Sequence, residues 1–243
     1  LKKIKDGVFD NARNSGKAVN FGKPGGLSAK TMRAYAIRSY GVDLPESKWV
    51  EILAMWDAEW QEMPHYFRWI DGMRGKRGRA TIDKAGHRKI EQLYNLPQPG
   101  SGRLRASCTY CSACNSVYQG LLSDVLKRAG WYLFKACYLR GSMPGAEALY
   151  GCRPVNEIHD QFLVEAPSIR GDAAARAVGM LMNRAGAEIC PDVPVKCEPI
   201  LAKRWSKRAE ERRADGLLVA WEDARLAVSG GLAVLGGTAT GGK

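Results

Sequence analysis

The stretch that decides the fold is Arg13-Asn14-Ser15-Gly16-Lys17-Ala18-Val19-Asn20-Phe21-Gly22. It continues a segment from residue 8 that accepts a helix. Pro24-Gly25-Gly26 must then end or kink this helix, because proline lacks the N–H group and clashes with the preceding turn. Residues four apart project from one stripe of a helix, so Arg13, Lys17 and Phe21 share a stripe. Two cations and an aromatic ring suit a triphosphate and a flat base, and a solvated helix face is the plain alternative.

Two more helices follow in the N-terminal part. Ser28 caps a helix that closes at Gly41, because serine accepts backbone N–H groups at a helix start and glycine tolerates the left-handed conformation at its end. A third helix carries apolar side chains at i, i+3, i+4 and i+7, which are most simply core. They are Trp49, Ile52, Leu53, Trp56 and Trp60. Residues 72–102 are basic and broken by Gly and Pro, which indicates a loop with short elements.

The C-terminal part alternates helix and strand. The spacing of apolar residues predicts a long helix from residue 107 to about residue 138. Residues 153–165 hold two short apolar runs around His159-Asp160, the outline of a strand, a turn and a second strand. A helix over 171–187 and a strand over 193–200 are predicted to follow.

The composition favours a polyanionic partner. The 243 residues include 37 Lys and Arg against 25 Asp and Glu, a net charge of +12 that suits nucleic acid. Residues 68–105 hold ten Lys or Arg and three Asp or Glu, which is compatible with a solvated loop and with phosphate contact. No run of about 18 apolar residues and no signal peptide occurs, so we expect no membrane partner and a cytoplasmic protein.

The seven cysteines suggest free thiols, because the chain shows no secretion signal. Cys108, Cys111 and Cys114 are spaced CxxCxxC, a pattern that iron–sulfur and zinc proteins use. A fourth ligand would have to be another cysteine or a histidine, and none stands at a motif distance. If the run is helical, Cys108 and Cys114 diverge by about 120°. An iron–sulfur or zinc protein is therefore an alternative that rests on spacing alone.

Three ordered motifs resemble those of family A DNA polymerases, the polymerase I type. Residues 13–22 look like the RxxxKxxxFG helix of that family, and the Pro-Gly-Gly-Leu run that follows resembles its bacteriophage branch. Residues 115–120, Asn-Ser-Val-Tyr-Gln-Gly, continue through Asp124 and Lys127 and resemble the NxxxQG helix. Residues 158–161, Ile-His-Asp-Gln, resemble the palm motif that normally ends His-Asp-Glu.

The resemblance spans roughly residues 5–222, since 191–196 and 203–205 are also similar to the C-terminal stretch of the phage enzymes. It implies an α+β chain with the right-hand fold of polymerases. Residues 1–100 would form the fingers with the dNTP-binding helix. Residues 101–222 would form part of the palm, in which a short antiparallel hairpin packs on helices. The Gly-rich tail, 223–243, is predicted to be disordered.

The resemblance also implies roles for site residues. Arg13 and Lys17 would bind the triphosphate of the incoming dNTP, with Lys17 neutralising charge that develops on transfer. Phe21 would lie against the sugar and base, and a phenylalanine there is associated in this family with rejecting sugars that lack the 3′-hydroxyl. Asp160 would bind Mg²⁺ in a two-metal catalytic site, and His159 would support the primer terminus.

Primer–template DNA is the macromolecular partner that the resemblance implies. Asn115 and Gln119, one helical turn apart, would donate to the minor-groove acceptors that all Watson–Crick pairs share. The basic stretch 68–105, including Arg103 and Arg105, would face template or primer phosphates. Ordinary solvent-exposed polar residues are the plain alternative for both groups.

The sequence departs from the family pattern in four places. Gln161 replaces the usual glutamate, which removes a negative charge beside Asp160. Gly25 stands where bacterial enzymes have a tyrosine, and Cys111 where they have an arginine that grips the primer–template. No DYSxxE-like motif, which supplies the other metal-binding aspartate, occurs in the 243 residues. The second Asp ligand for Mg²⁺ is therefore expected outside this chain.

Two explanations account for the missing motif. The chain begins with Leu1 rather than methionine, so we expect it to be incomplete, with an upstream polymerase segment that carries the aspartate. In a split enzyme, a separate chain would supply it. The competing hypothesis is a catalytically degenerate relative that binds primer–template DNA without activity of its own. If the source is viral, we expect the protein in the cytoplasm of the host cell.

Overall fold

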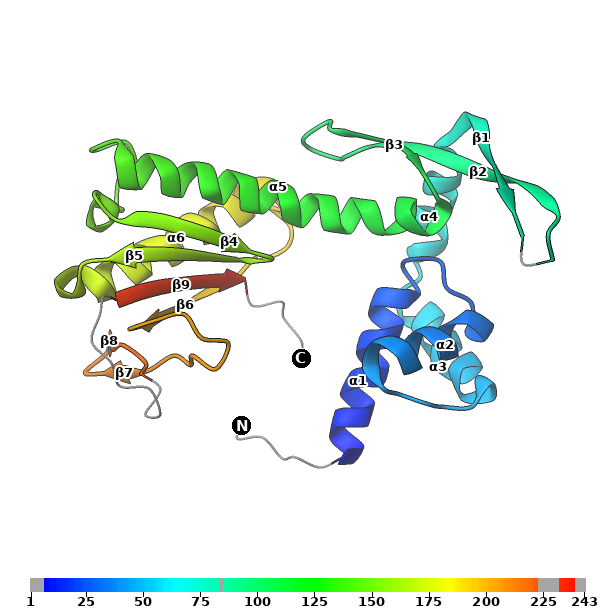
Figure 1. Cartoon of the computed structure of the whole chain (residues 1–243), viewed down its shortest axis with the longest axis horizontal. Helices are drawn as coiled ribbons and strands as arrows, with labels where there is room; N and C mark the ends of the chain where they lie inside the picture. The colour runs from blue at the N-terminus through cyan, green and yellow to red at the C-terminus, as the bar shows by residue number, and fades with distance from the viewer. Residues whose placement is uncertain (1–6, 84, 223–231, 239–243) are drawn as a thin grey trace. The chain divides into compact units, whose positions relative to one another are not determined.

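The computed structural model describes residues 7–83, 85–222 and 232–238 (Figure 1). They belong to two compact units, residues 1–120 and residues 121–243. The chain is α+β, as predicted, because the described residues combine α-helices with short antiparallel sheets. None of the described helices is long and apolar enough to cross a membrane.

Unit 1 begins with four helices: α1 (Gly7–Gly22), α2 (Ala29–Tyr40), α3 (Glu46–Glu59) and α4 (Met63–Asp71). The caps of α2 are confirmed, since Ser28 and Thr31 form a capping box and Gly41 ends the helix with a φ of 67°. Trp60 corrects the predicted core, because α3 ends at Glu59 and the Trp60 side chain is 46% exposed. The buried side chains of the shared core are Ala18, Val19, Met32, Ala36, Val42, Trp49, Leu53, Trp56 and Met63.

The segment predicted as a loop with short elements over 72–102 forms two strands, β1 (Arg74–Ile82) and β2 (Arg88–Pro97). They join β3 (Leu104–Cys108) in an antiparallel sheet of order β1-β2-β3. Tyr94 and Leu96 alternate along β2 and are buried in one cluster with Ile70 and Cys108. Burial against residues distant in sequence therefore outweighs the local effect of the glycines.

The long helix predicted from residue 107 is confirmed as α5 (Tyr110–Tyr138). Its residues up to Gly120 belong to unit 1 and the remainder to unit 2. The predicted strand, turn and strand are confirmed as β4 (Arg153–Ile158) and β5 (Gln161–Ala166), and the helix that follows as α6 (Gly171–Ile189).

The last predicted strand begins later than the sequence pattern indicated. Strand β6 (Cys197–Ala202) starts four residues beyond Val193. Pro194 offers no N–H group to a neighbouring strand. The N–H of Cys197 donates instead to Asn183 Oδ1 of α6 at 2.6 Å, which marks the start of the strand.

The sheet of unit 2 has the order β4-β5-β9-β6. Strand β9 (Leu232–Thr238) pairs antiparallel with both β5 and β6. These seven residues are therefore ordered, which corrects the predicted disorder for this part of the tail. Backbone pairing on both sides compensates for the low intrinsic preference of glycine for strands. The remaining tail residues, 223–231 and 239–243, lie outside the described residues.

The core of unit 2 lies between this sheet and two helices. Phe162, Val164 and Ala166 of β5 are buried in one cluster with side chains of α5 and α6. The alternating residues Leu163 and Glu165 face the other side of the sheet. Four short elements complete the unit: η1 (Glu147–Leu149), η2 (Ser168–Arg170), β7 (Arg213–Ala214) and β8 (Leu217–Leu218).

The turn after α1 yields a stability prediction. Gly26 has a φ of 79°, and a Cβ added there would lie 2.7 Å from the Tyr110 ring. Gly26→Ala is therefore expected to lower the free energy of unfolding by about 1–3 kcal/mol, measured by urea unfolding.

Gly16→Ala is the matched control, because an added Cβ in this helical position meets nothing within 4 Å. Removing an exposed helical glycine should leave stability unchanged or raise it by up to about 1 kcal/mol. Equal destabilisation by the two substitutions would contradict the steric argument.

Candidate active site

Helix α1 exposes the stripe that the sequence predicts for nucleotide binding. Ala18 and Val19 are buried in the core of unit 1, so the stripe of Arg13, Lys17 and Phe21 lies away from the core. Arg13 is exposed and Lys17 is half-buried, while the Phe21 side chain is 54% exposed. The structure therefore leaves an aromatic ring and two cations on one side of the helix, open to a ligand.

The C-terminal end of α1 is held by α3. The Trp56 Nε1 group donates a hydrogen bond to Asn20 Oδ1 at 3.1 Å. The Lys23 ammonium lies 2.8 Å from an Asp57 carboxylate oxygen and 5.9 Å from the centre of the Trp56 ring. These contacts come from residues of α1 and the following turn that lie outside the stripe, so they fix the helix without occupying Phe21.

The glycine turn brings the end of α1 against the start of α5. A Cβ added at Gly25 would lie 2.6 Å from Asn115 Nδ2, and Gly25 is buried. Only glycine permits this approach without displacing the amide. Asn115 Nδ2 also donates to the Cys111 carbonyl oxygen at 3.1 Å, which holds the side chain at the turn. Two of the motifs singled out in the sequence therefore meet in unit 1.

The glycine of the NxxxQG motif also has a packing role. A Cβ added at Gly120 would lie 1.9 Å from Gln98 Oε1, and the buried Gln98 donates from Nε2 to the Val117 carbonyl at 3.0 Å. Gln119, the residue before it, is exposed. The loop between β2 and β3 thus packs on α5 at Gly120 while leaving the Gln119 side chain in solvent.

The two arginines predicted to contact DNA lie near this loop. Arg103 donates from Nη2 to the Gly120 carbonyl at 3.4 Å. Arg105 is exposed on β3. Arg103 therefore lies next to the NxxxQG motif, and Arg105 lies on the surface of the same unit.

The three cysteines with CxxCxxC spacing do not converge. Cys108 is on β3, whereas Cys111 and Cys114 are on α5. Cys111 is exposed and the other two are buried. Within the described ranges, no group of three His, Cys, Asp or Glu residues is placed to hold a metal ion. The structure gives the iron–sulfur or zinc alternative no support there.

In unit 2, His159 and Asp160 form the two-residue turn between β4 and β5. Ile158 pairs with Gln161 across this turn. His159 is exposed and has a φ of 57°, a conformation that non-glycine residues adopt at a cost of about 1–2 kcal/mol. Asp160 is half-buried. Backbone strain of this kind is common at functional sites, so the turn is a reasonable place for chemistry.

The described residues do not by themselves provide the magnesium site that the resemblance implies. Mg²⁺ prefers oxygen ligands, commonly carboxylates. Asp160 is the carboxylate of the turn, and its neighbour Gln161 is a neutral amide. Among the described residues, no group of three His, Cys, Asp or Glu side chains that includes Asp160 is placed to hold a metal ion.

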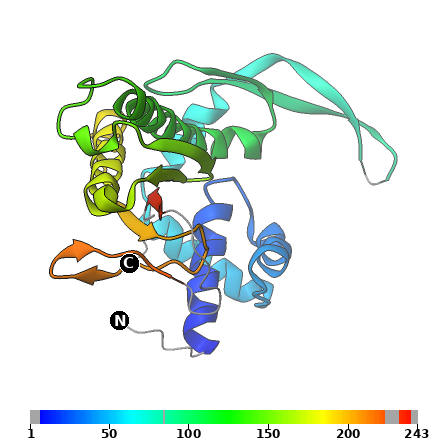
Figure 2. The same cartoon turned by 60° about the vertical axis from the view of Figure 1, so that its left-hand side comes forward.

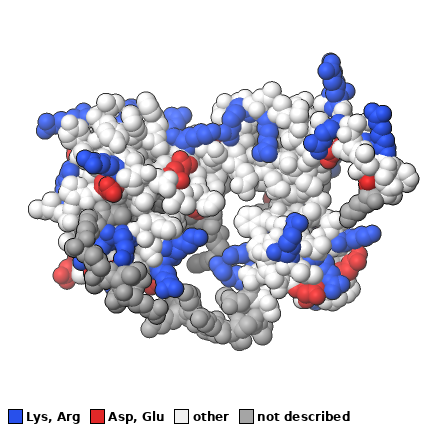
Figure 3. All heavy atoms as spheres, viewed as in Figure 1, with Lys and Arg blue, Asp and Glu red and all other residues white. Residues whose placement is uncertain are grey.

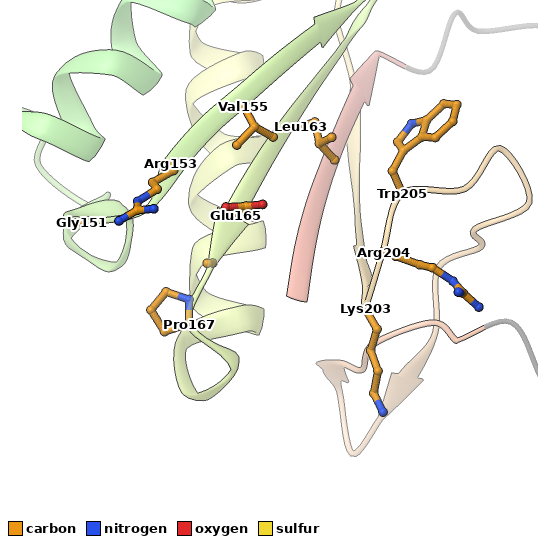
Figure 4. Close-up of a pocket in the computed structure, with 10 residues that line it drawn as sticks. Gly151, Arg153, Val155, Leu163, Glu165, Pro167, Lys203, Arg204 and Trp205 are labelled. Atoms are coloured by element: carbon orange, nitrogen blue, oxygen red, sulfur yellow. The ribbon is translucent and has the colours of Figure 1, made fainter. Parts of the chain in front are cut away.

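A hollow of about 590 Å³ lies on the sheet face of unit 2 opposite the buried core (Figure 4). Arg153 and Val155 come from β4, and Leu163 and Glu165 from β5. Across β9, the lining is completed by residues 203–205, Lys-Arg-Trp, which follow β6 (Figure 4). Sequence reasoning assigned this hollow no role, although residues 203–205 contributed to the family resemblance.

Sequence reasoning missed the residues that hold the site together. Tyr110 packs on Gly26, and Gln98 packs on Gly120. The sequence positions of Tyr110 and Gln98 follow no pattern that would indicate which glycine each contacts. The glycines were the available signal, because a glycine beside a motif residue often marks a close approach of another segment.

Comparison with known proteins supports the polymerase resemblance. No family model matches the chain. The chain is similar to DNA polymerase I of Aquifex aeolicus (strain VF5), with 28% identity over 207 residues. The match covers 85% of this chain and 32% of the relative, so the chain spans about a third of the relative's length. This similarity supports a relationship to the family A polymerases.

The cysteine environments yield a second prediction. Burial raises the pKa of the Cys114 thiol to about 11 and that of Cys137 to about 12, so both have little thiolate at pH 8. We expect the exposed Cys111 to react fastest with a thiol reagent at pH 8.

Cys111→Ser should remove the fastest phase, and Cys114→Ser should leave it in place. If the fast phase remains in Cys111→Ser and disappears in Cys114→Ser, then Cys114 and not Cys111 is the accessible thiol, which contradicts the prediction.

Proposed function

We propose that this chain is the fingers and palm portion of a bacteriophage-type family A DNA polymerase, which adds dNTPs to a primer 3′-hydroxyl during viral DNA replication. The observation that carries the proposal is the exposed stripe of Arg13, Lys17 and Phe21 on α1. The end of this helix meets Asn115 at the glycine turn. The similarity to a DNA polymerase I along most of the chain supports it.

The α1 stripe would bind the incoming dNTP. Arg13 and Lys17 would contact the triphosphate, and Phe21 would pack on the sugar and base. When the primer 3′-oxygen attacks the α-phosphorus, the bond from that phosphorus to the bridging oxygen breaks and pyrophosphate leaves. Lys17 is half-buried, so its charge is less screened by water and can neutralise the charge that develops on the leaving group.

The first turns of α5 would bind the primer–template. A side-chain amide nitrogen has two hydrogens, and Asn115 uses one of them for the Cys111 carbonyl. The other is available for a minor-groove acceptor, and Gln119 offers a second donor one turn along the helix. Arg103 and Arg105 would add contacts to phosphates. Donors aimed at shared minor-groove acceptors sense the shape of a base pair without distinguishing its sequence.

The β4–β5 turn would face the primer terminus. Asp160 would supply one carboxylate to a magnesium site, and His159 would support the primer. The proposal places the second aspartate, which the family resemblance implies, in other polypeptide, since the sequence contains no DYSxxE-like motif. That polypeptide would be an upstream polymerase segment or a separate chain.

The test of Asp160 uses the polymerase that contains this chain. We expect Asp160→Asn to lower primer extension by at least about 100-fold, because a metal ligand contributes several kcal/mol to stabilising the transition state. Primer–template affinity, measured by fluorescence anisotropy, should change by less than about twofold. Asp192→Asn, an exposed aspartate of the same unit, is the control. Retained extension would remove Asp160 from the metal site.

A second candidate function is a nucleic-acid-binding subunit without activity, which the neutral Gln161 beside Asp160 favours. In an active polymerase, Gln161→Glu should leave primer extension equal or higher, because it restores a carboxylate beside the proposed ligand. A large loss of extension would show that Gln161 has a role of its own. DNA affinity without extension, in the protein that contains this chain together with the other polypeptide and in its Gln161→Glu variant, would support the inactive subunit.

Discrimination between sugars tests Phe21. We expect Phe21→Tyr to raise the use of dideoxynucleotides relative to deoxynucleotides by about fivefold. A tyrosine hydroxyl can supply one hydrogen bond of about 1 kcal/mol in place of the missing 3′-hydroxyl. Phe134→Tyr, at a similarly exposed ring of unit 2, is the control. An unchanged ratio in Phe21→Tyr would separate Phe21 from the sugar.

A further inference from the structure

Residues 76–83 and 85–92, most of which belong to β1 and β2, form a two-stranded arm (Figures 1 and 2). Strand β3 pairs with β2 only along 94–97, so the more distal part of the ribbon has no third strand. The two strands of the arm pair in register from Gly78 opposite Gln92 to Ile82 opposite Arg88. The buried cluster at its base begins at Tyr94. The arm therefore extends beyond the core of unit 1.

The described side chains of the arm are largely exposed on both faces. Ile82 is 75% exposed and Ile90 is 62% exposed. A two-stranded ribbon without a core is marginally stable in water, and exposed isoleucines add no stability to it. Nothing in the packing of unit 1 explains the length of the arm or its apolar side chains, which points to a binding partner.

The charge of the arm indicates what that partner is. Arg79 pairs with Glu91 at 2.5 Å. Asp83 accepts the N–H groups of His87 and Ala85, which lowers the pKa of its carboxyl. Both described carboxylates of the arm are thus engaged within it. Lys76, Arg77 and Arg88 have no carboxylate within ion-pair distance among the residues that the structure describes.

The cations project from both faces of the ribbon. Residues paired across two strands share a face, so Arg79 and Lys89 lie on one face, with their partners Glu91 and Thr81. Arg88 lies on the other face with Ile82 and Ile90. Figure 3 shows Lys and Arg side chains projecting from the part of unit 1 where Figure 1 places this ribbon.

We propose that the arm lies in a groove of duplex nucleic acid and binds the phosphates of both strands. The major groove of B-DNA, about 12 Å wide, admits a two-stranded ribbon. Cations on both faces suit a site flanked by two rows of phosphates, and the isoleucines would be buried against sugars and base edges. The inference rests on the proposed function in one respect: the primer–template would be the duplex that is held.

Salt dependence of binding tests the arm directly. In a chain with Lys76→Ala, Arg77→Ala and Arg88→Ala, we expect duplex affinity at about 100 mM NaCl to fall at least tenfold. The slope of log K against log[NaCl] should become shallower by about 2 to 3, since each phosphate contact contributes about 0.9. A labelled duplex followed by fluorescence anisotropy provides both values. Thermal melting should be unchanged, because the arm has no core.

The matched control removes the same charge from elsewhere in unit 1. Lys30→Ala, Arg38→Ala and Lys48→Ala replace exposed cations of α2 and α3, and should leave the slope within about one. Equal losses in the two triple variants would overturn the proposal. So would an equal dependence on the arm for a single strand of the same sequence, or for polyglutamate as an acidic polypeptide.

The isoleucines provide a test that is independent of charge, because replacing them should change duplex affinity without changing its salt dependence. Ile82→Ser with Ile90→Ser should lower duplex affinity several-fold at an unchanged salt slope, because burial of apolar surface does not release counterions. Unchanged affinity would overturn their place in the groove. If the polymerase that contains this chain does not extend primers but its duplex binding depends on the arm, the proposed function alone is contradicted. If it extends primers and its duplex binding does not depend on the arm, this inference alone is contradicted.

Discussion

The burial of helix α5 in two cores is the constraint on which the rest of the structure depends. Its 29 residues contribute Ala113 and Cys114 to the cluster beneath β2 and β3, and Val125 and Leu133 to the core of unit 2. A helix satisfies its own backbone hydrogen bonds, so it can pass from one core to the other without an exposed break.

Two glycines let packed elements approach closely enough to form the candidate site. At Gly25 the missing side chain lets Asn115 lie against the turn after α1, and at Gly120 it lets Gln98 lie against α5. A single methyl group at either place would meet a polar side chain at less than 3 Å. The glycines in these motifs are therefore explained by packing, and the nearby Phe21 and Gln119 side chains are exposed.

Local signals predicted much of the fold, and the errors share one cause. Caps and apolar spacing placed α1, α2, α5 and α6 because each helix forms its hydrogen bonds within one segment. The ribbon of β1 and β2 was mistaken for a loop, and β9 for a disordered tail. Strand β9 exists because it pairs with β5 and β6, whereas β1 and β2 pair with each other in a hairpin whose base packs on α4 and α5. In both places the local glycine content suggested irregular structure. The residue types of the candidate site could likewise be named, but not their supports Tyr110 and Gln98.

The sequence by itself determined the chemistry of the candidate groups and the periodic faces of the helices, because residue type and spacing are local properties. It placed Arg13, Lys17 and Phe21 on one stripe and His159 and Asp160 in one turn, both as the structure has them. Only the tertiary structure decided that the glycine turn meets Asn115, that the three spaced cysteines separate between a strand and a helix, and that a basic segment becomes an arm. These features depend on burial and strand pairing in the folded chain, which the residue types and spacings of a single segment do not encode.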